Sequence, residues 1–178
     1  MADRRAVKTR SSLERSFNEI FLAEGYEKTT PARVAEAAEV GRSTFYEHFA
    51  GQEDLLEKRL ARVLLPLAEA AFSETVPADL EPTLDHFWSK RVIVRTLFAG
   101  RARTVTIRAL IVLIEDRILA QPKRPAISSR LLAAQIAGGQ LGLLEEWLCG
   151  RHHCSSGALA NSIASCSRAV AAACSGEK

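Results

Sequence analysis

The segment RSTFYEH, residues 42–48, gathers side chains that can form hydrogen bonds with an external ligand. The guanidinium of Arg42 can pair with the two acceptors, O6 and N7, on the edge of a guanine. The hydroxyls of Ser43 and Thr44 can reach a base edge or a phosphate, and the groups of Tyr46 and His48 can donate to phosphate oxygens. Residues of these types, on one exposed face, favour contact with nucleic acid.

Two short helices must position these side chains. Thr30 precedes a proline and predicts a helix start, because its oxygen can cap free N–H groups and proline suits the first helical position. We expect one helix over 32–38 and a second over 42–49, in which Phe45 and Phe49 lie four residues apart and pack beneath the helix. Two short helices, a three-residue turn and a hydrogen-bonding outer face predict a helix-turn-helix.

The stretch TTPARVAEAAEVGRSTFYEHFAGQEDLL, residues 29–56, resembles the DNA-binding signature of the tetracycline-repressor (TetR) family of bacterial regulators. The preceding Gly25–Tyr26 pair also fits. The resemblance implies an all-α protein with an N-terminal three-helix helix-turn-helix domain and a C-terminal helical ligand-binding and dimerisation domain. It further implies a cytoplasmic, ligand-responsive repressor that binds a palindromic operator in double-stranded DNA as a homodimer and is released by a small molecule.

The resemblance and the physical reading together assign roles in DNA binding. Tyr46 and His48 match the family's phosphate-contacting pair, and residues 42–44 stand at the base-reading start of the second helix. Helix N-termini attract phosphates, so Thr30 is expected to face one. The full candidate set is Thr30, Arg33, Arg42, Ser43, Thr44, Tyr46, His48 and Gln52.

Three residues depart from the family pattern. Glu39 replaces a common glycine in the turn and is expected at positive φ, at a cost of about 1 kcal/mol. Gly41 replaces a small hydroxyl residue and removes a cap from the second helix. Gln52 replaces a frequent lysine, so one phosphate contact loses its charge. Weak intrinsic affinity, or reliance on the N-terminal arm, would follow.

Bulk charge does not argue for DNA binding. The formal net charge of the 178 residues is only +3, and residues 1–62 hold equal numbers of basic and acidic side chains. The basic segment 3–10 is either a frayed, solvated terminus or a flexible arm that reaches DNA. No apolar run approaches the ~20 residues that span a bilayer, and no membrane partner is expected. The four cysteines fall near the C-terminus, so reduced thiols in the cytosol are expected.

The chain divides into three expected parts. Residues 1–50 form the helix-turn-helix domain, residues 51–76 a connecting helix and linker, and residues 77–178 a helical effector-binding and dimerisation domain. Pro66 should kink or break the connecting helix near Arg62, because proline inside a helix clashes with the preceding turn. Further helices are expected over 52–72, 101–120, 126–150 and 156–173, with a loop over 73–82. Residues 84–98 are expected to form one helix or two with a bend, closed by Gly100.

The stretch LLAAQIAGGQLGLLEEWLCGR is similar to the penultimate helix of many TetR-family companion domains. Together with the final helix, that helix forms a four-helix dimer bundle with the same two helices of a second copy. The three glycines of the stretch each cost about 0.5–1 kcal/mol inside a helix, and close approach of another helix would offset this. That helix is either a second copy's or the chain's own. The interface candidates are Gly138, Gly142, Leu143, Trp147, Ala160, Ala164 and Ala171.

The effector is less well specified by the sequence. Aromatic and basic side chains of the second part could line a cavity, or could simply form core and solvated surface. The run from Lys90 to Arg108 holds basic residues and no acidic one, so any that face inward favour an anionic effector. The candidates are Phe87, Trp88, Arg91, Arg95, Phe98, Arg108 and Gln135, and no cofactor is expected.

Two alternatives stay open. Cys149, His152, His153 and Cys154 have the composition of a Zn²⁺ or Cu⁺ site, which would suit metal or redox sensing, or they form an incidental loop. The helix-turn-helix could also serve as a protein-interaction module. An enzyme is not expected, because the sequence has no glycine-rich phosphate loop, nucleophile elbow or paired carboxylates beside a cleft.

Overall fold

The computed structural model describes residues 2–174, in which all the regular elements are helices and no β-strand is present. The all-α prediction is therefore confirmed. The elements are α1 (Ala2–Glu24), η1 (Tyr26–Lys28), α2 (Pro31–Ala37), α3 (Arg42–His48), α4 (Gln52–Val63), α5 (Leu65–Ala70), α6 (Leu80–Ser89), α7 (Arg91–Val94), η2 (Arg95–Phe98), α8 (Gly100–Leu119), α9 (Ser129–Leu148) and α10 (Ser156–Ala173).

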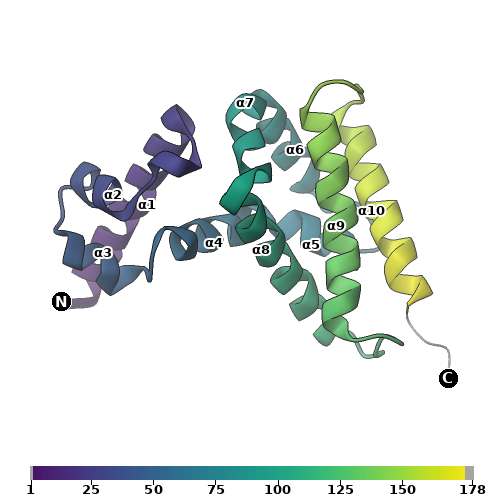
Figure 1. Cartoon of the computed structure of the whole chain (residues 1–178). Coiled ribbons are helices and arrows are strands. Elements are labelled where there is room, and N and C mark those ends of the chain that lie inside the picture. Colours follow the sequence, from purple (N-terminus) through teal and green to yellow (C-terminus); the bar gives the residue numbers. More distant parts are fainter. Residues whose placement is uncertain (1, 175–178) are drawn as a thin grey trace.

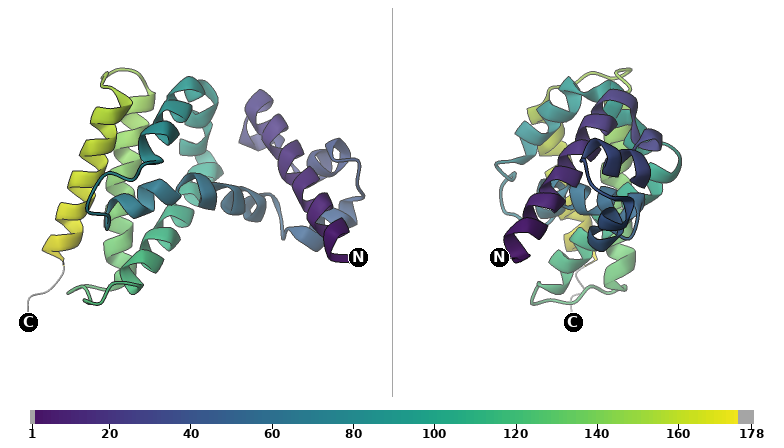
Figure 2. Two further views of the ribbon diagram at one scale, coloured as in Figure 1. Left: turned by 180° about the vertical axis from the view of Figure 1, so that it is seen from behind. Right: turned by 90° about the vertical axis from the view of Figure 1, so that its left-hand side faces the viewer.

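The helices form two groups joined by α4 (Figure 1). Helices α1 to α3, here called the head, gather at one end of the molecule, and α5 to α10, here called the body, form a bundle at the other end. The rear view in Figure 2 shows the same arrangement, with α9 and α10 side by side on the part of the body away from the head. No helix in residues 2–174 combines the length and the apolar composition needed to cross a membrane.

Helix α1 starts earlier than the sequence suggests. The sequence predicts a frayed terminus or a flexible arm over residues 3–10, but these residues belong to α1, which begins at Ala2. The segment is therefore helical, and its contact with DNA stays a prediction. Arginine, lysine and alanine favour helix, so the segment before the buried Leu13 continues the same helix toward the N-terminus. The Arg10–Glu14 pair, with 3.1 Å between Nε and Oε1, supports this extension at the i, i+4 spacing.

The prolines set the helix boundaries around the linker. The predicted break is confirmed, because α4 ends at Val63 and Pro66 lies in the first turn of α5, where its missing N–H has no partner to lose. The loop expected over 73–82 is shorter than predicted, since α6 begins at Leu80 and Pro82 is also accommodated in a first helical turn. Gly100 starts α8 at φ 50° rather than closing the preceding helix.

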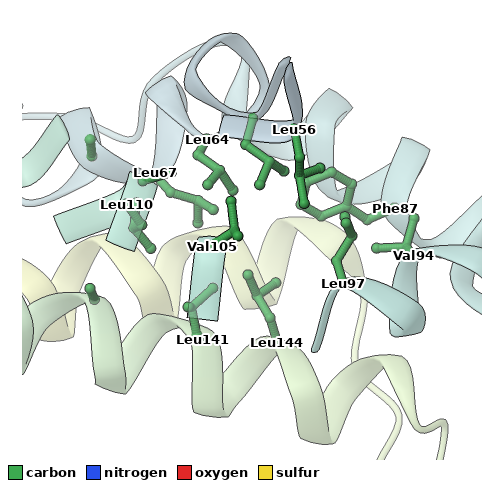
Figure 3. Close-up of a cluster of buried hydrophobic side chains, with 14 of the residues drawn as sticks. Leu56, Leu64, Leu67, Phe87, Val94, Leu97, Val105, Leu110, Leu141 and Leu144 are labelled. Atoms are coloured by element: carbon green, nitrogen blue, oxygen red, sulfur yellow. The ribbon is translucent and has the colours of Figure 1, made fainter. Parts of the chain in front are cut away.

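The body packs around a continuous apolar core. Leu110 of α8 and Leu141 and Leu144 of α9 are fully buried, and Figure 3 shows them near Leu67 of α5. The same close-up shows that the core extends through Val105 to side chains of α4, α6, α7 and η2. Burial of side chains of this size contributes roughly 1.5–3 kcal/mol each, so the core holds the body together. Gln140 adds a polar link, donating to Leu67 O at 3.0 Å and to Ser167 Oγ at 2.9 Å.

Candidate nucleic-acid interface

Helix α3 presents polar side chains on its outer face and buries its aromatic residues. Phe45 and Phe49 are 0% and 1% exposed, which confirms that they pack beneath the helix. Arg42, Ser43 and Tyr46 are exposed, and Thr44 and His48 are half-buried. The outer face therefore holds all five side chains that the sequence singles out.

The exposed aromatic ring on this face is held in place. The Tyr46 ring packs edge-on against Phe45, with ring centroids 5.5 Å apart, and the Arg42 guanidinium lies 5.9 Å from the Tyr46 ring centroid. Arg42 is thus pre-positioned on the outer face by a weak cation–π contact and forms no ion pair in the described residues. Its donors remain available for a base edge.

The caps of the two helices agree with the sequence. The Thr30 side chain accepts from Arg33 N at 3.5 Å and begins α2. Gly41 begins α3 without a side-chain hydrogen bond, so the expected loss of a cap is confirmed. The first N–H groups of α3 therefore lack a side-chain partner from the N-cap.

The turn between α2 and α3 is a Schellman motif. Glu39 N donates to Glu36 O and Val40 N donates to Ala35 O, both at 3.0 Å, which is the 5→2 and 6→1 pattern that ends many helices. This motif places its C′ residue in the left-handed region, and Glu39 has φ 56°. The prediction of positive φ at this residue is confirmed.

The Glu39→Gly variant should be more stable than the native protein by about 1 kcal/mol, because glycine adopts positive φ without the steric cost that a Cβ brings. Thermal or denaturant unfolding of the head measures the change. Glu36→Gly, an exposed position inside α2, is the control and should lose roughly 0.5–1 kcal/mol. A lower midpoint for Glu39→Gly would contradict the assignment of strain to this residue.

Arg33 is engaged within the head. Its guanidinium donates to Glu24 Oε1 at 2.6 Å and to Oε2 at 2.9 Å, a two-pronged pair at the surface. The hydrogen bond from Arg33 lowers the pKa of the Glu24 carboxyl below its usual value. A DNA contact from Arg33 stays a prediction, and it would have to compete with this pair.

Gln52 is also engaged within the head. Its amide nitrogen donates to Tyr26 O at 2.6 Å and to Thr29 Oγ1 at 3.0 Å, so both amide hydrogens have partners. Thr29 is fully buried and donates to the same carbonyl, and burial raises the pKa of the Tyr26 phenol to about 12. Gln52 thus links the start of α4 to the turn before α2. The family commonly has a phosphate-binding lysine at this position, and that comparison does not predict such a link.

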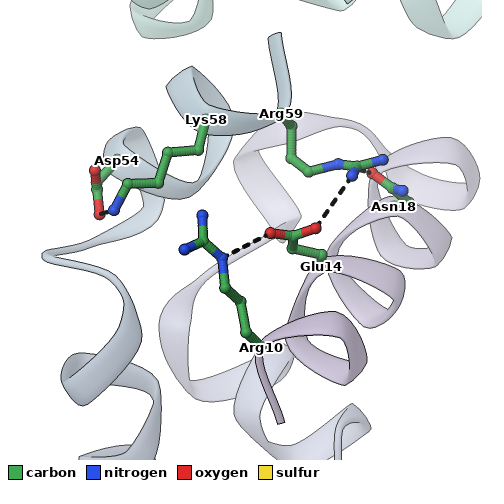
Figure 4. Close-up of polar contacts among 6 residues, drawn as sticks. All are labelled: Arg10, Glu14, Asn18, Asp54, Lys58 and Arg59. Atoms are coloured by element: carbon green, nitrogen blue, oxygen red, sulfur yellow. Dashed lines mark hydrogen bonds and ion pairs between the residues drawn. The ribbon is translucent and has the colours of Figure 1, made fainter. Parts of the chain in front are cut away.

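A polar brace holds α4 against α1 (Figure 4). Glu14 accepts from Arg10 at 3.1 Å and from Arg59 at 3.3 Å, and Arg59 Nε donates to Asn18 Oδ1 at 3.2 Å. The partners lie up to 45 residues apart in sequence. Their spacing along the chain therefore gives no signal that would have found them.

The seven effector candidates do not share one cavity. Phe87 is buried between the head and the body, whereas Gln135 lies on the outer surface of α9. Trp88 packs against Trp147 with ring centroids 4.8 Å apart, and Arg91 lies 5.0 Å from the Trp88 ring centroid. The remaining three also occupy separate places: Arg108 pairs with Glu53 and Glu57, Arg95 is exposed, and Phe98 packs against the core.

The Cys/His segment does not form a metal-binding group. Within residues 2–174, no three His, Cys, Asp or Glu side chains converge as metal ligands. The His153 ring instead packs edge-on against Trp88, with centroids 5.7 Å apart, and the carbonyl of Cys154 accepts from Trp147 Nε1 at 3.1 Å. Cys149 and His152, the other two residues of this segment, also belong to no such group, and Cys149 is a free thiol. The arrangement of these four side chains therefore does not support the metal-sensing alternative.

The interface candidates fall into two groups. Gly138 and Leu143 are exposed on α9, with Gly142 beside them half-buried. A Cβ built on either glycine would meet no atom of the chain within 4 Å. The other candidates are buried in the chain's own core, and so lack the exposed surface that an interface with another molecule requires: Trp147, Ala160, Ala164 and Ala171.

Comparison with known sequences identifies the head. Residues 18–58 match the family model described as bacterial regulatory proteins, tetR family. The regulator TcmR of Streptomyces glaucescens is 46% identical over 55 residues, which are 31% of this chain and 24% of TcmR. YxbF, an uncharacterised helix-turn-helix regulator of Bacillus subtilis, is 37% identical over 62 residues, 34% of this chain and 16% of YxbF. The similarity thus spans no more than a quarter of either curated relative.

Solved structures extend the likeness of fold to the body. RolR in complex with resorcinol superposes with a TM-score of 0.53 at 19% identity, over 98% of both chains. NalD of Pseudomonas aeruginosa, the secondary repressor of the MexAB-OprM multidrug efflux pump, gives 0.52 at 22% identity, over 92% of this chain and 95% of NalD. The fold is therefore all-helical with an N-terminal helix-turn-helix. Residues 18–58 of this chain are a segment of the kind found in the tetR family of bacterial regulatory proteins.

Proposed function

We propose that this protein is a cytoplasmic repressor that binds a palindromic operator as a homodimer and leaves it when a small molecule binds. The observation that carries the proposal is the outer face of α3, whose hydrogen-bonding side chains are exposed above a buried pair of phenylalanines within the segment that matches the tetR family. In this proposal residues 1–50 bind DNA and residues 77–178 bind the effector and form the dimer. Residues 51–76 connect these two parts.

On DNA, α3 lies in the major groove with its N-terminal residues toward the base edges. Arg42 is assigned to a guanine, with Ser43 and Thr44 beside it, and each well-formed bidentate contact provides about 1–3 kcal/mol of discrimination. Tyr46 and His48, with Thr30 at the start of α2, are assigned to phosphates, which fix the register of the head without reading sequence.

The surface of α9 supports a dimer. Glycines inside a helix lower its stability, and Gly138, Gly139 and Gly142 have no neighbour within 4 Å that would explain them inside one chain. Leu131, 62% exposed on the same helix, adds apolar surface. Close approach of α9 of a second copy would bury this surface, and a two-fold dimer would present two heads about 34 Å apart.

A small-molecule effector is supported by the body and by one relative of similar fold. The structure of RolR contains the ligand resorcinol. The body of this chain has a comparable helical arrangement and places Lys90, from its basic run, at the edge of a cavity. These observations favour an effector that carries an apolar part and a negative charge.

Selection of bound sequences from random duplexes tests the proposal. We expect an inverted repeat with half-sites about 10 base pairs apart, and binding that weakens steeply with salt because phosphate contacts release counterions. A variant with Ser43, Thr44 and Tyr46 replaced by alanine is the control and should enrich no sequence. Absence of any enriched sequence for the native protein at about 50 mM salt would favour a protein-interaction module instead.

A further inference from the structure

A cavity of about 330 Å³ lies at the junction between the head and the body. This volume is at the low end of the ~300–1,000 Å³ typical of ligand pockets, so it suits a small molecule. Its walls come from three separate stretches of the chain: α1, α4, and the segment from α6 to η2. Figure 3 shows part of its wall, where Leu56 of α4 meets Phe87, Val94 and Leu97.

The lining combines apolar walls with a positively charged edge. The apolar residues are Phe17, Phe21, Leu22, Leu56, Leu60, Val63, Phe87, Val94 and Leu97. The polar side chains at the cavity are Asn18, Arg59, His86 and Lys90, and no acidic residue lines it. Arg59 is already paired with Glu14 and Asn18. Lys90 is exposed and has no ion-pair partner in the part of the chain that the structure describes.

We propose that this cavity binds a small amphipathic organic anion, with an apolar ring or chain between α1 and α6 and a single carboxylate or sulfonate at Lys90. The apolar walls favour the hydrocarbon part through burial. The absence of acidic lining residues and the unpaired ammonium favour a negative charge at the edge. The regulatory consequence of this binding rests on the proposed function, whereas the binding itself does not.

The position of the cavity explains how its occupant would act on DNA binding. The brace from Glu14 and Asn18 to Arg59 ties α1 to α4, while α2 packs on α1 and α3 packs on α2. Helix α4 also packs against α8 of the body, and the ion pairs of Arg108 with Glu53 and Glu57 at the surface add little to this contact. An apolar ligand that contacts α1 and α6 together would therefore favour one angle between head and body over others.

Calorimetric titration of the full-length protein with decanoate tests the site, and 1-decanol serves as the uncharged analogue. Val63→Phe, which fills the cavity from α4, should weaken decanoate binding about tenfold or more, since a blocked pocket loses most of its apolar contact. Lys90→Gln should weaken decanoate about threefold and leave 1-decanol unchanged, because the charge pair at an exposed edge is modest.

Matched controls separate the cavity from nonspecific surface binding. Val63 and Val112 are 36% and 38% exposed, and Val112→Phe on α8 should leave decanoate binding unchanged. Leu22→Phe fills the cavity from α1 and should repeat the Val63→Phe result, with Leu119→Phe as its control at similar exposure, 48% against 50%. Thermal unfolding of each variant identifies any that fails to fold.

Equal weakening by the cavity and control variants would overturn the site, as would the absence of saturable decanoate binding. Equal loss of decanoate and 1-decanol in Lys90→Gln would overturn the assignment to an anion. The operator experiment is separate: decanoate should weaken operator binding by the native protein and not by Val63→Phe. If decanoate binds in the cavity without this effect, the regulatory role is wrong; if no operator exists, the proposed function fails while the binding result stands.

Discussion

The Gly138→Glu variant should be a folded monomer that binds operator DNA about 10²–10⁴-fold more weakly than the native protein, because it loses the gain from presenting two heads together. Gly138 is exposed in the middle of α9, and a Cβ added there would meet no atom within 4 Å beyond the neighbouring backbone of α9 itself. Within one chain, replacing glycine should even stabilise the helix by roughly 0.5–1 kcal/mol. The substitution should therefore destabilise the dimer without destabilising the fold of the single chain.

The two-fold symmetry of the proposed dimer makes the effect large. An isologous interface brings the same patch from both copies together, so the variant introduces two carboxylates into one close helix contact. Burying such charges without partners is strongly unfavourable. Sedimentation should give a mass near one chain, 19.5 kDa, while circular dichroism and thermal unfolding stay native or improve.

Thr104→Glu is the control for the added charge. Thr104 is exposed on α8, and this variant should remain a dimer with native operator affinity. If Gly138→Glu also sediments as a dimer, the α9 surface is not the interface, and the cost of its glycines would need another explanation.

Local patterns predicted the head better than the body. Thr30 as a cap, Phe45 and Phe49 as core and Glu39 at positive φ each follow from residues within a few positions of one another, and the structure confirms them. Such features depend on the backbone geometry of one helix or one turn, which the neighbouring residue types determine.

Long-range pairing accounts for most of what the sequence did not reveal. Gln52 meets Tyr26 across 26 residues, and Arg33 meets Glu24 across nine, so a polar residue on a predicted DNA-facing surface can already have a partner in the head. The cavity at the junction of head and body was missed for the same reason. Of the seven effector candidates only Phe87 lines this cavity. Its walls come from separate stretches of the chain, and the sequence does not distinguish their apolar residues from ordinary core residues.

The Arg42→Ala variant should lose sequence discrimination at one guanine of each half-site while keeping its fold. The expected loss is about 1–3 kcal/mol per bidentate contact, and the symmetric dimer makes the contact twice, so the operator affinity should fall by about 2–6 kcal/mol. Arg42 is exposed and rests only on the Tyr46 ring, so its removal should leave thermal unfolding unchanged.

Salt dependence distinguishes a base contact from a phosphate contact. Arg42→Ala should leave the slope of log affinity against log salt unchanged, whereas loss of a charged phosphate contact lowers it by about one. Arg42→Lys should behave much like Arg42→Ala in specificity, because lysine keeps the charge but lacks the planar fork that matches guanine.

Arg33→Ala is the matched control, because Arg33 is equally an exposed arginine of the head but is paired with Glu24. Because the pair with Glu24 occupies the Arg33 guanidinium, we expect the operator affinity of Arg33→Ala to change by less than about threefold, and a larger loss would show that Arg33 contacts DNA instead. Binding selection on random duplexes should recover the native motif for Arg33→Ala and a motif degenerate at one position per half-site for Arg42→Ala. An unchanged motif in Arg42→Ala would mean that the reading of bases begins elsewhere on α3, with Ser43 and Thr44 the remaining donors.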